Sequence, residues 1–351
     1  MVYVYNVISI ILVSWFLRCI SGIDKKNFFF FFCLIQMTLI IGLRYRVGAD
    51  YIPYERMYNY LGGGVYVGYK YDTVEIGYSI LNQILWKIGV PYWGLNLLVA
   101  FLTILFMLKA IKEWSVDFFL SVYLYISFFF FYHAMNQTRQ GLAIAIGFYA
   151  VALLSKGYVK KFLFWIIFGS LFHITLLIFL PLLFLRKIKF NKSALYIYTA
   201  IIFVLFIGFS IIIQLIKITR YSIYINSLYD LEGLTSSKMN LAVRVIMLIL
   251  ALIRYKSVED SAKKRLLYHM IMICTVFQIL TIRSSLFGRV TTPFFGAYIF
   301  LIPDLIYNVR RKYQKLVYYG CIGVATLYQI VYFNAMSDSV LVNKYKSILF
   351  H

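Results

Sequence analysis

The sequence predicts an all-α, polytopic integral membrane protein, with about ten to twelve transmembrane helices in a single multi-pass domain over residues 1–351. Two observations lead to this fold class. The chain is 62% hydrophobic and 14% charged, with a mean hydropathy of +0.81, whereas soluble domains are about a quarter charged. Apolar runs also recur along the whole chain, at lengths close to those that cross a hydrocarbon core of ~30 Å.

Ten apolar runs are predicted as spans: Met1–Leu17, Phe28–Leu43, Leu95–Leu108, Phe118–Ala134, Gly141–Leu154, Ala194–Ile216, Leu241–Ile253, Leu266–Ile282, Phe287–Ile306 and Leu316–Phe333. A further run, Phe162–Leu185, contains His173 midway and predicts either one long helix or a re-entrant or broken helix around His173. The amphipathic run Ile76–Val90 is expected to lie along the interface or to dip into the membrane. It belongs to an extracytoplasmic loop at 44–94.

The basic residues predict the orientation of the chain. The net charge is +22, and 21 of the 35 cations lie in alternate connections between the apolar runs: 18–27, 109–117, 156–161, 186–192, 254–265 and 307–315. The positive-inside rule places these connections in the cytoplasm. This assignment requires that Phe162–Leu185 doubles back, because a single crossing there would put the cations of 186–192 outside. We therefore favour the doubled-back form.

Several function classes lack their motifs. The chain contains no Walker loop, no GxGxxG, no G-x-S-x-G and no zinc-ligand spacing, and its four cysteines form no C-x-x-C pair. No cofactor and no metal are therefore expected. The cations follow the membrane pattern and carry no nucleic-acid-binding signature, so nucleic acid is not an expected partner.

The stretch "GLRYRVGADYIPY" places a dense polar cluster at the end of an apolar run. Arg44 and Arg46 follow this run, Gly48 allows a turn, and Asp50 comes directly after it. Guanidinium groups suit bidentate contacts to phosphate oxygens and stay charged at low dielectric. The sequence therefore indicates a site for a diphosphate-bearing substrate. Interfacial anchoring of the arginines is the alternative.

The stretch "HAMNQTRQGLAIAI" begins a second predicted span. Asn136, Arg139 and Gln140 recur at steps of three and four residues, so they share one helix face. Such polar residues at the start of a span need a partner or a water-filled cavity. We interpret Arg139 as functional, with His133 as a weaker neighbour.

Three further residues complete the predicted site. His173, in "SLFHITLLIFLP", is a candidate general base or ligand of a hydroxyl or phosphate, and a packing role is its alternative. Arg289, in "RSSLFGRVTTPFF", has no acidic neighbour in sequence and points to an anionic ligand. Glu75 is placed to pair with an arginine. In the predicted topology, all these motifs lie on the outer face or at helix ends that point to it.

The ordered set "LRYRVGADYIPY", "EIGYSILN", "NQTRQGLAIAI", "FHITLLIFLP", "GRVTTPF" and "KYKSIL" resembles the EpsG-like group of Wzy-type polysaccharide polymerases over nearly the whole chain. The matching positions are Arg44, Gly48, Asp50, Tyr51, Tyr54, Glu75, Gly77, Asn136, Arg139, Gln140, His173 and Arg289. In this chain Arg289 is followed by Thr-Thr-Pro, where more aromatic character is expected. The tail reads Asn-Lys-Tyr-Lys-Ser, where Pro-Tyr-Lys is more typical.

The resemblance implies a bacterial inner-membrane enzyme that acts outside the cytoplasm. It would transfer a growing glycan from undecaprenyl diphosphate to a hydroxyl of the next lipid-linked repeat unit, for an O-antigen, capsule or exopolysaccharide. We expect His173, Asp50, Arg139 and Arg289 to be catalytic, with His173 ahead of Asp50 as base. The residues expected to bind diphosphate or glycan are Arg44, Arg46, Tyr51, Tyr54, Glu75, Asn136, Gln140, Arg283 and His133.

Beyond its lipid-linked substrate and membrane lipids, the expected partners are a chain-length regulator and a flippase of the same pathway. A flippase of lipid-linked oligosaccharide is the main alternative function, because it too needs arginines for a diphosphate. A membrane acyltransferase with His173 as base is the third reading. Its acyl donor would come from the cytoplasm, on the side away from the predicted site.

Overall fold

The computed structural model describes residues 2–21, 24–64, 74–219, 222, 225, 228–257, 260–340 and 345–350, without the side chains of 18, 228–239, 257 and 335–340. This part of the chain is helical and contains no strands, which confirms the predicted all-α fold class. The expected single multi-pass domain is organised as two compact units. Unit 1 comprises Met1–Leu180 and Arg310–His351, and unit 2 comprises Pro181–Val309.

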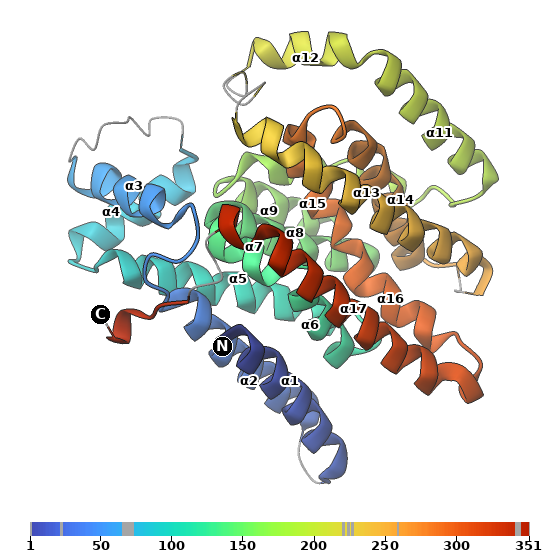
Figure 1. Cartoon of the computed structure of the whole chain (residues 1–351), viewed down its shortest axis with the longest axis horizontal. Coiled ribbons are helices and arrows are strands. Elements are labelled where there is room, and N and C mark those ends of the chain that lie inside the picture. The colour runs from blue at the N-terminus through green and yellow to red at the C-terminus, as the bar shows by residue number, and fades with distance from the viewer. Residues whose placement is uncertain are drawn as a thin grey trace. The chain divides into compact units, whose positions relative to one another are not determined.

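The helices of unit 1 are α1 (Val2–Cys19), α2 (Lys25–Gly42), α3 (Tyr51–Gly63), α4 (Ile76–Lys87), α5 (Tyr92–Trp114), α6 (Phe118–Ser127), α7 (Phe130–Asn136), α8 (Thr138–Ser155), α9 (Val159–Ser170), η1 (Ile174–Phe179), α17 (Arg311–Val340) and η5 (Ile348–Phe350) (Figure 1). Those of unit 2 are α10 (Leu182–Leu185), α11 (Lys192–Ile207), α12 (Phe209–Lys217), α13 (Leu228–Ile253), η3 (Tyr255–Ser257), α14 (Ala262–Leu280), η4 (Ser285–Phe287), α15 (Gly288–Phe295) and α16 (Ala297–Tyr307).

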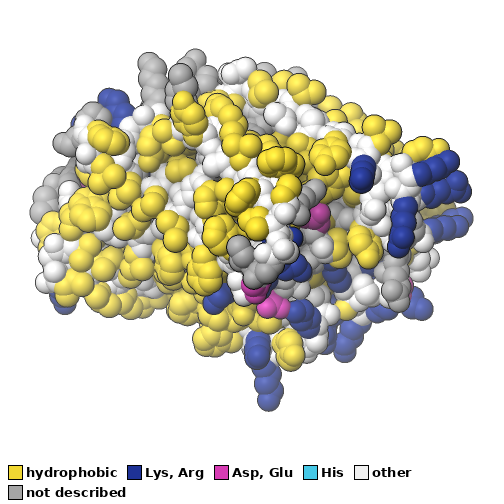
Figure 2. Space-filling model, turned by 90° about the horizontal axis from the view of Figure 1, so that it is seen from below, with side chains coloured by type: hydrophobic (Ala, Val, Ile, Leu, Met, Phe, Trp, Pro, Cys, Tyr) yellow, Lys and Arg dark blue, Asp and Glu magenta, His cyan; other side chains and the backbone are white. Residues whose placement is uncertain are grey.

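The protein is a multi-pass membrane protein. Among the described helices, four are long and apolar enough to cross a membrane, or up to seven if each of three bent helix pairs counts as one span. This number lies below the ten to twelve expected, because several apolar runs form helices of only 10–17 residues. Large apolar side chains are exposed on most helices, and Figure 2 shows hydrophobic side chains covering much of the face in view. Such a surface suits lipid rather than water.

Helices α2, α5 and α8 form the centre of unit 1, since α5 packs against both of the others. Their ends differ in charge. At one end Lys112 of α5 donates to the Asn27 side chain of α2, and Lys156, after α8, pairs with Glu113. We call this the basic end of unit 1. At the other end α2 stops at Gly42, and the polar motifs of the sequence are found there.

The chain breaks between α9 and η1, at Leu171–His173. Helix α9 starts near the basic end, and η1 then runs back along α8 and α9. Two glycines allow this close approach, because a Cβ on Gly147 would lie 2.5 Å from Leu176 and one on Gly169 would lie 2.3 Å from it. The break confirms the broken helix predicted around His173.

The end of the chain returns to the segment after α2. Tyr45 N donates to Lys346 O at 2.9 Å, and Ile348 N donates to Leu43 O at 2.9 Å. These bonds form an isolated antiparallel bridge between Arg44 and Ser347. The closing sequence motif therefore pairs with the first motif, 303 residues away, and both lie at the end of unit 1 opposite its basic end (Figure 1).

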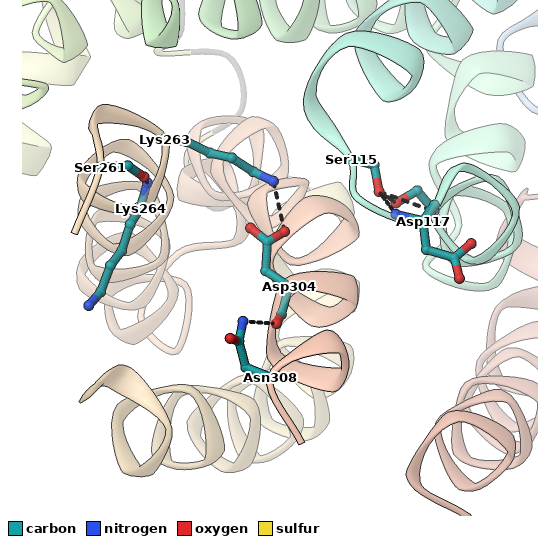
Figure 3. Close-up of polar contacts among 8 residues, drawn as sticks. Ser115, Asp117, Ser261, Lys263, Lys264, Asp304 and Asn308 are labelled. Atoms are coloured by element: carbon teal, nitrogen blue, oxygen red, sulfur yellow. Dashed lines mark hydrogen bonds and ion pairs between the residues drawn. The ribbon is translucent and has the colours of Figure 1, made fainter. Parts of the chain in front are cut away.

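Unit 2 is built around α14, which packs against α11, α13, α15 and α16. Cations gather at the first turns of α14, and two of them pair with carboxylates. Lys263 donates to Asp304 at 2.8 Å, and the Asn308 amide donates to Asp304 O at 2.7 Å (Figure 3). Arg265 pairs with Asp260 at 2.9 Å, and this contact lowers the pKa of the Asp260 carboxyl. We call this the basic end of unit 2.

Candidate functional site

The first arginine of the predicted site is enclosed by the protein. The Arg44 side chain is fully buried. Its Nη1 donates to Ile41 O at 2.6 Å, its Nε to Val47 O at 3.2 Å and its Nη2 to Thr138 Oγ1 at 3.3 Å. Ile41 O is one of the last carbonyls of α2, which have no partner within the helix. Arg44 therefore caps α2 and ties this end to the start of α8, and burial lowers the pKa of its guanidinium.

The loop that follows docks onto the end of α7. Gly48 has φ = 96°, a conformation that glycine adopts without strain, and a Cβ there would lie 3.0 Å from Asn136 Oδ1. The same oxygen accepts a hydrogen bond from Asp50 N at 3.2 Å. Asn136 therefore positions the loop from Gly48 to Asp50. Arg46, by contrast, is exposed, and its guanidinium carbon lies 5.3 Å from the Tyr45 ring centroid.

Arg139, in the first turn of α8, lies in a cluster contributed by three segments. It pairs with the Glu75 carboxylate, and the two side chains are 19% and 11% exposed. Its guanidinium carbon lies 5.8 Å from the ring centroids of both Tyr54 and Tyr78, within cation–π range. The Nε of Arg139 is buried and has no hydrogen-bond acceptor within the described part of the chain.

Buried phenols line this cluster. Tyr51, Tyr54, Tyr78 and Tyr92 are each at most 8% exposed. Burial raises the pKa of Tyr51 to about 12 and also raises the pKa of Tyr54 and Tyr78. The phenols are therefore neutral near pH 7 and can donate hydrogen bonds. Rings with a polar edge beside a cation suit a ligand with both sugar faces and phosphate.

His173 adjoins the same cluster through Glu75. Glu75 Oε1 accepts a hydrogen bond from Ile174 N at 3.3 Å, directly after His173. The His173 ring caps η1: its Nδ1 lies 2.7 Å from Thr175 Oγ1 and accepts from Thr175 N at 3.4 Å. We infer from this geometry that Nδ1 is an acceptor and that the proton of the neutral ring is on Nε2. His173 is then better suited to donate to an oxyanion than to remove a proton.

Two other predicted residues lie nearby in α7 and α8. Gln140 is 2% exposed. The Nε2 of His133 is buried, and no residue that the structure describes forms a hydrogen bond to it. No group of three or more His, Cys, Asp or Glu side chains that could hold a metal ion occurs among the described residues.

Arg283 and Arg289 belong to unit 2. Arg283 is exposed; its Nη1 donates to Phe206 O at 3.0 Å, and its guanidinium carbon lies 4.2 Å from the Phe206 ring centroid. Arg289 is half-buried in the first turn of α15. Another arginine of this unit, Arg244, was not among the predicted site residues. Its signal was a single cation inside the predicted span Leu241–Ile253.

In unit 1 the structure brings together most of the residues that the sequence predicted. Those that meet around the start of α8, directly or through one neighbour, are Arg44, Asp50, Tyr51, Tyr54, Glu75, Asn136, Arg139 and His173. The arrangement can hold an anion beside neutral phenols and a carboxylate. Because the Arg44 guanidinium is enclosed by the protein, Arg139 and Arg46 are the arginines of this arrangement that can contact an anion.

Comparisons with known proteins agree with the motif pattern. A family model described as the EpsG family matches residues 26–347. No curated protein and no solved structure matches the chain. The family is associated with polysaccharide polymerisation by glycosyl transfer. Because the match covers nearly the whole chain, the protein belongs to the EpsG family.

Proposed function

We propose that the protein is a polymerase that extends a surface polysaccharide outside the cytoplasm, at the bacterial inner membrane. It transfers the growing glycan from undecaprenyl diphosphate to a hydroxyl of the next undecaprenyl-diphosphate-linked repeat unit. Membership of the EpsG family supports a polysaccharide polymerase in general. The observation that carries the more specific proposal is the cluster of Arg139, Glu75, Tyr54 and Tyr78 at the end of unit 1 opposite its basic end.

This cluster suits a lipid diphosphate for a physical reason. A charged arginine at the start of a membrane-crossing helix is costly unless it meets a partner or a ligand. Glu75 balances the charge of Arg139, but Nε keeps a donor without an acceptor among the described residues. The first turn of α8 adds the positive end of a helix dipole. The exposed Arg46 supplies a further cation on the loop held by Arg44.

In the proposed reaction, the acceptor hydroxyl oxygen forms a bond to the anomeric carbon of the donor glycan. The bond from that carbon to the diphosphate oxygen breaks, and its electron pair leaves with the diphosphate. Arg139 stabilises the charge on this leaving group, a type of interaction worth about 3–4 kcal/mol for one well-placed donor. Arg289 of unit 2 is proposed to be required as well, on the sequence motif alone. Undecaprenyl diphosphate then leaves with both phosphates.

The hydroxyl proton needs a base, and the geometry changes the expected order of candidates. His173 was the first candidate, but its Nδ1 is used in capping η1. We propose that His173 donates Nε2–H to a phosphate or hydroxyl oxygen. Asp50, next to Asn136 at the same end of unit 1, then accepts the proton. A positioned general base typically contributes about 10²–10⁴-fold in rate.

The test is the length distribution of surface glycan from cells that depend on this protein. Arg139→Ala and Arg289→Ala are each expected to abolish long chains while the protein still reaches the membrane. Lys156→Ala is the matched control for Arg139→Ala, because Lys156 follows the opposite end of α8 in a pair that is more than 40% exposed on both sides. Wild-type chain lengths in both arginine variants would exclude the leaving-group role.

A deletion strain separates polymerisation from transport. Cells without a polymerase are expected to display single repeat units outside, because an independent flippase still delivers them. Cells without a flippase display none. Absence of single units from the deletion strain would therefore replace the proposal with the flippase reading.

A further inference from the structure

Arg244 lies at the end of unit 2 that is opposite its basic end. Its partner Gln278 is fifteen residues after Lys263 on α14, which places the two about 22 Å apart along the helix axis. Both Arg244 and Gln278 belong to unit 2, and Arg283 follows the same end of α14. Unit 2 therefore carries a second polar cluster at a helix end without acidic residues.

The described side chains that contact the Arg244 guanidinium are neutral. The guanidinium donates to Gln278 Oε1, and its carbon lies 4.5 Å from the centroid of the Phe295 ring. The orientation of Gln278 is held by Thr281, because Gln278 Nε2 donates to Thr281 Oγ1 at 2.8 Å and this hydroxyl donates to Gln278 O at 2.6 Å. Arg244 Nε is buried, with no acceptor in the part of the chain that is described.

Among the side chains that the structure describes in unit 2, no carboxylate contacts Arg244. Asp304 pairs with Lys263 and Asp260 with Arg265, both at the basic end. The acids nearest in α13 precede Arg244 by at least twelve residues, or about 18 Å along the helix. Glu259 is outside the described residues. Arg139, by comparison, pairs directly with Glu75.

The surroundings of α13 indicate where an anion would come from. Beyond Arg244, the exposed side chains of α13 are apolar: Ile246, Ile249, Leu250 and Ile253. At 100° per residue these four lie on the face opposite Arg244, so lipid contacts one side of α13 while Arg244 faces α14 and α15. Arg244 therefore lies within the apolar part of α13, on the side that packs against α14 and α15.

From this geometry we propose that Arg244 and Gln278 form an anion site in unit 2 that binds the phosphate or diphosphate headgroup of a lipid. A cation in an apolar helix that meets no acid among the described residues is stable when an anion binds to it. The Arg244 Nε–H remains as a hydrogen-bond donor, and the contacts to Gln278 and Phe295 fix the orientation of the guanidinium group. That the lipid is the polyprenyl diphosphate substrate rests on the polymerase function proposed above, whereas headgroup binding does not.

The test measures binding by the purified full-length protein in neutral detergent micelles, with radiolabelled undecaprenyl phosphate as the probe. Arg244→Gln is expected to lower affinity roughly 10-fold or more, the size typical of losing a charged hydrogen bond. Arg254→Gln is the matched control, because Arg254 directly follows the same helix and donates to Asn308 O. Its affinity should equal that of the wild type.

A second variant keeps the test informative if Arg244→Gln is poorly folded. Gln278→Glu is almost isosteric and places a carboxylate beside Arg244, as Glu75 is placed beside Arg139. An anion site predicts a similar loss of binding together with equal or higher thermal stability. If Arg244 has only a structural role, neither substitution changes the affinity for the probe. Unchanged affinity in both Arg244→Gln and Gln278→Glu would therefore overturn the proposal.

Competition distinguishes the source of the phosphate. If inorganic pyrophosphate displaces the probe from the wild type but not from Arg244→Gln, the site recognises the phosphate group alone. Arg244-dependent binding that pyrophosphate does not displace indicates a lipid headgroup held together with its chain. Because binding is measured without glycan transfer, normal chain lengths in the Arg139 and Arg289 variants would refute the polymerase mechanism and leave this result unaffected.

Discussion

The arginines of this chain differ in what surrounds their guanidinium groups. Arg44 donates to two backbone carbonyls and a hydroxyl and has no exposed surface. Arg139 pairs with a carboxylate, whereas Arg244 has a neutral amide and an aromatic face. These surroundings assign different work to residues of one type. Arg44 stabilises the loop that follows α2. Arg139 belongs to a site in which Glu75 balances its charge, and Arg244 is suited to bind an anionic ligand.

The enclosed position of Arg44 predicts an effect on stability. Arg44→Ala removes three hydrogen bonds and leaves buried carbonyls of Ile41 and Val47 without this donor. We expect a loss of roughly 2–4 kcal/mol in the free energy of unfolding, measured by denaturant or thermal unfolding in detergent micelles. Arg46→Ala, two residues away on an exposed side chain, should unfold like the wild type. Equal stability of both variants would show that Arg44 is not an anchor.

Helix α4 presents three different surfaces. Four isoleucines at four-residue spacing form one exposed stripe: Ile76, Ile80, Ile84 and Ile88. Tyr78 and Asn82 are buried on the opposite side, and Gln83 and Lys87 are exposed beside the stripe. The helix has 12 residues and is too short to cross a bilayer. Protein, lipid and water can thus each contact one side, as in a helix that lies in the membrane interface.

The start of α4 contacts the residue that follows α9. Gly77 N donates to Leu171 O at 2.9 Å. Leu171 directly follows α9 and is exposed, as are Phe164 and Ile167 within α9. Helix α4 begins directly after Glu75, which pairs with Arg139. We therefore expect the membrane surface to set the depth of the proposed site.

Spin labels on α4 test this placement in lipid vesicles. A label at Ile84→Cys is expected to be more accessible to oxygen, which concentrates in lipid, than to a water-soluble nickel complex. A label at Gln83→Cys, one residue away, should show the opposite preference. Equal access of the nickel complex to both labels would mean that α4 lies in water.

The return of η1 along α8 depends on a glycine. A Cβ on Gly147 would lie 2.5 Å from Leu176 and 2.7 Å from Phe179, which are both buried. Gly147→Ala is therefore expected to push η1 away from α8 and to destabilise the protein by about 1–3 kcal/mol, the usual cost of overpacking. Thermal unfolding of the purified protein measures this.

Gly323→Ala is the control for this substitution, because no atom lies within 4 Å of a Cβ at Gly323 in α17. Its unfolding temperature should match or slightly exceed that of the wild type, since alanine favours helix. A Gly147→Ala protein as stable as the Gly323→Ala protein would show that η1 does not approach α8 as closely as described.

Across unit 1, charge is segregated between the two ends of the membrane-crossing helices. One end carries Lys112 and Lys156 with their partners, and the other carries the Arg139 cluster. The positive-inside rule predicts that the first end is cytoplasmic. Chain reversal at Leu171–His173 agrees with the doubled-back form that this orientation requires.

Cysteine labelling in intact cells tests the orientation in a variant without the four native cysteines. A membrane-impermeant maleimide is expected to label Arg56→Cys, an exposed position of α3, and not Lys160→Cys, an exposed position after the basic end. Both should react after the cells are permeabilised. Labelling of Lys160→Cys alone in intact cells would reverse the orientation and place the Arg139 cluster inside.

The sequence by itself determined the class of the protein and where its polar residues lie. Apolar excess and basic connections specify a helical membrane protein because each residue responds to lipid or water locally. The break at His173 and the polar ends of α2 and α8 were predictable for the same reason. The family was also recognisable, since ordered motifs such as Arg139 with Gln140 are read directly from the chain.

Only the tertiary structure decided what each charged side chain contacts. Arg44 and Ser347 form a bridge across 303 positions, and Arg139 meets Glu75 from 64 residues away. Such pairing depends on how helices pack, which local pattern does not encode. The free energy of a buried charge depends on its neighbours in space. The tertiary structure therefore determines that Arg44 is enclosed by the protein, that Arg139 can contact a ligand, and that Arg244 has neutral described neighbours.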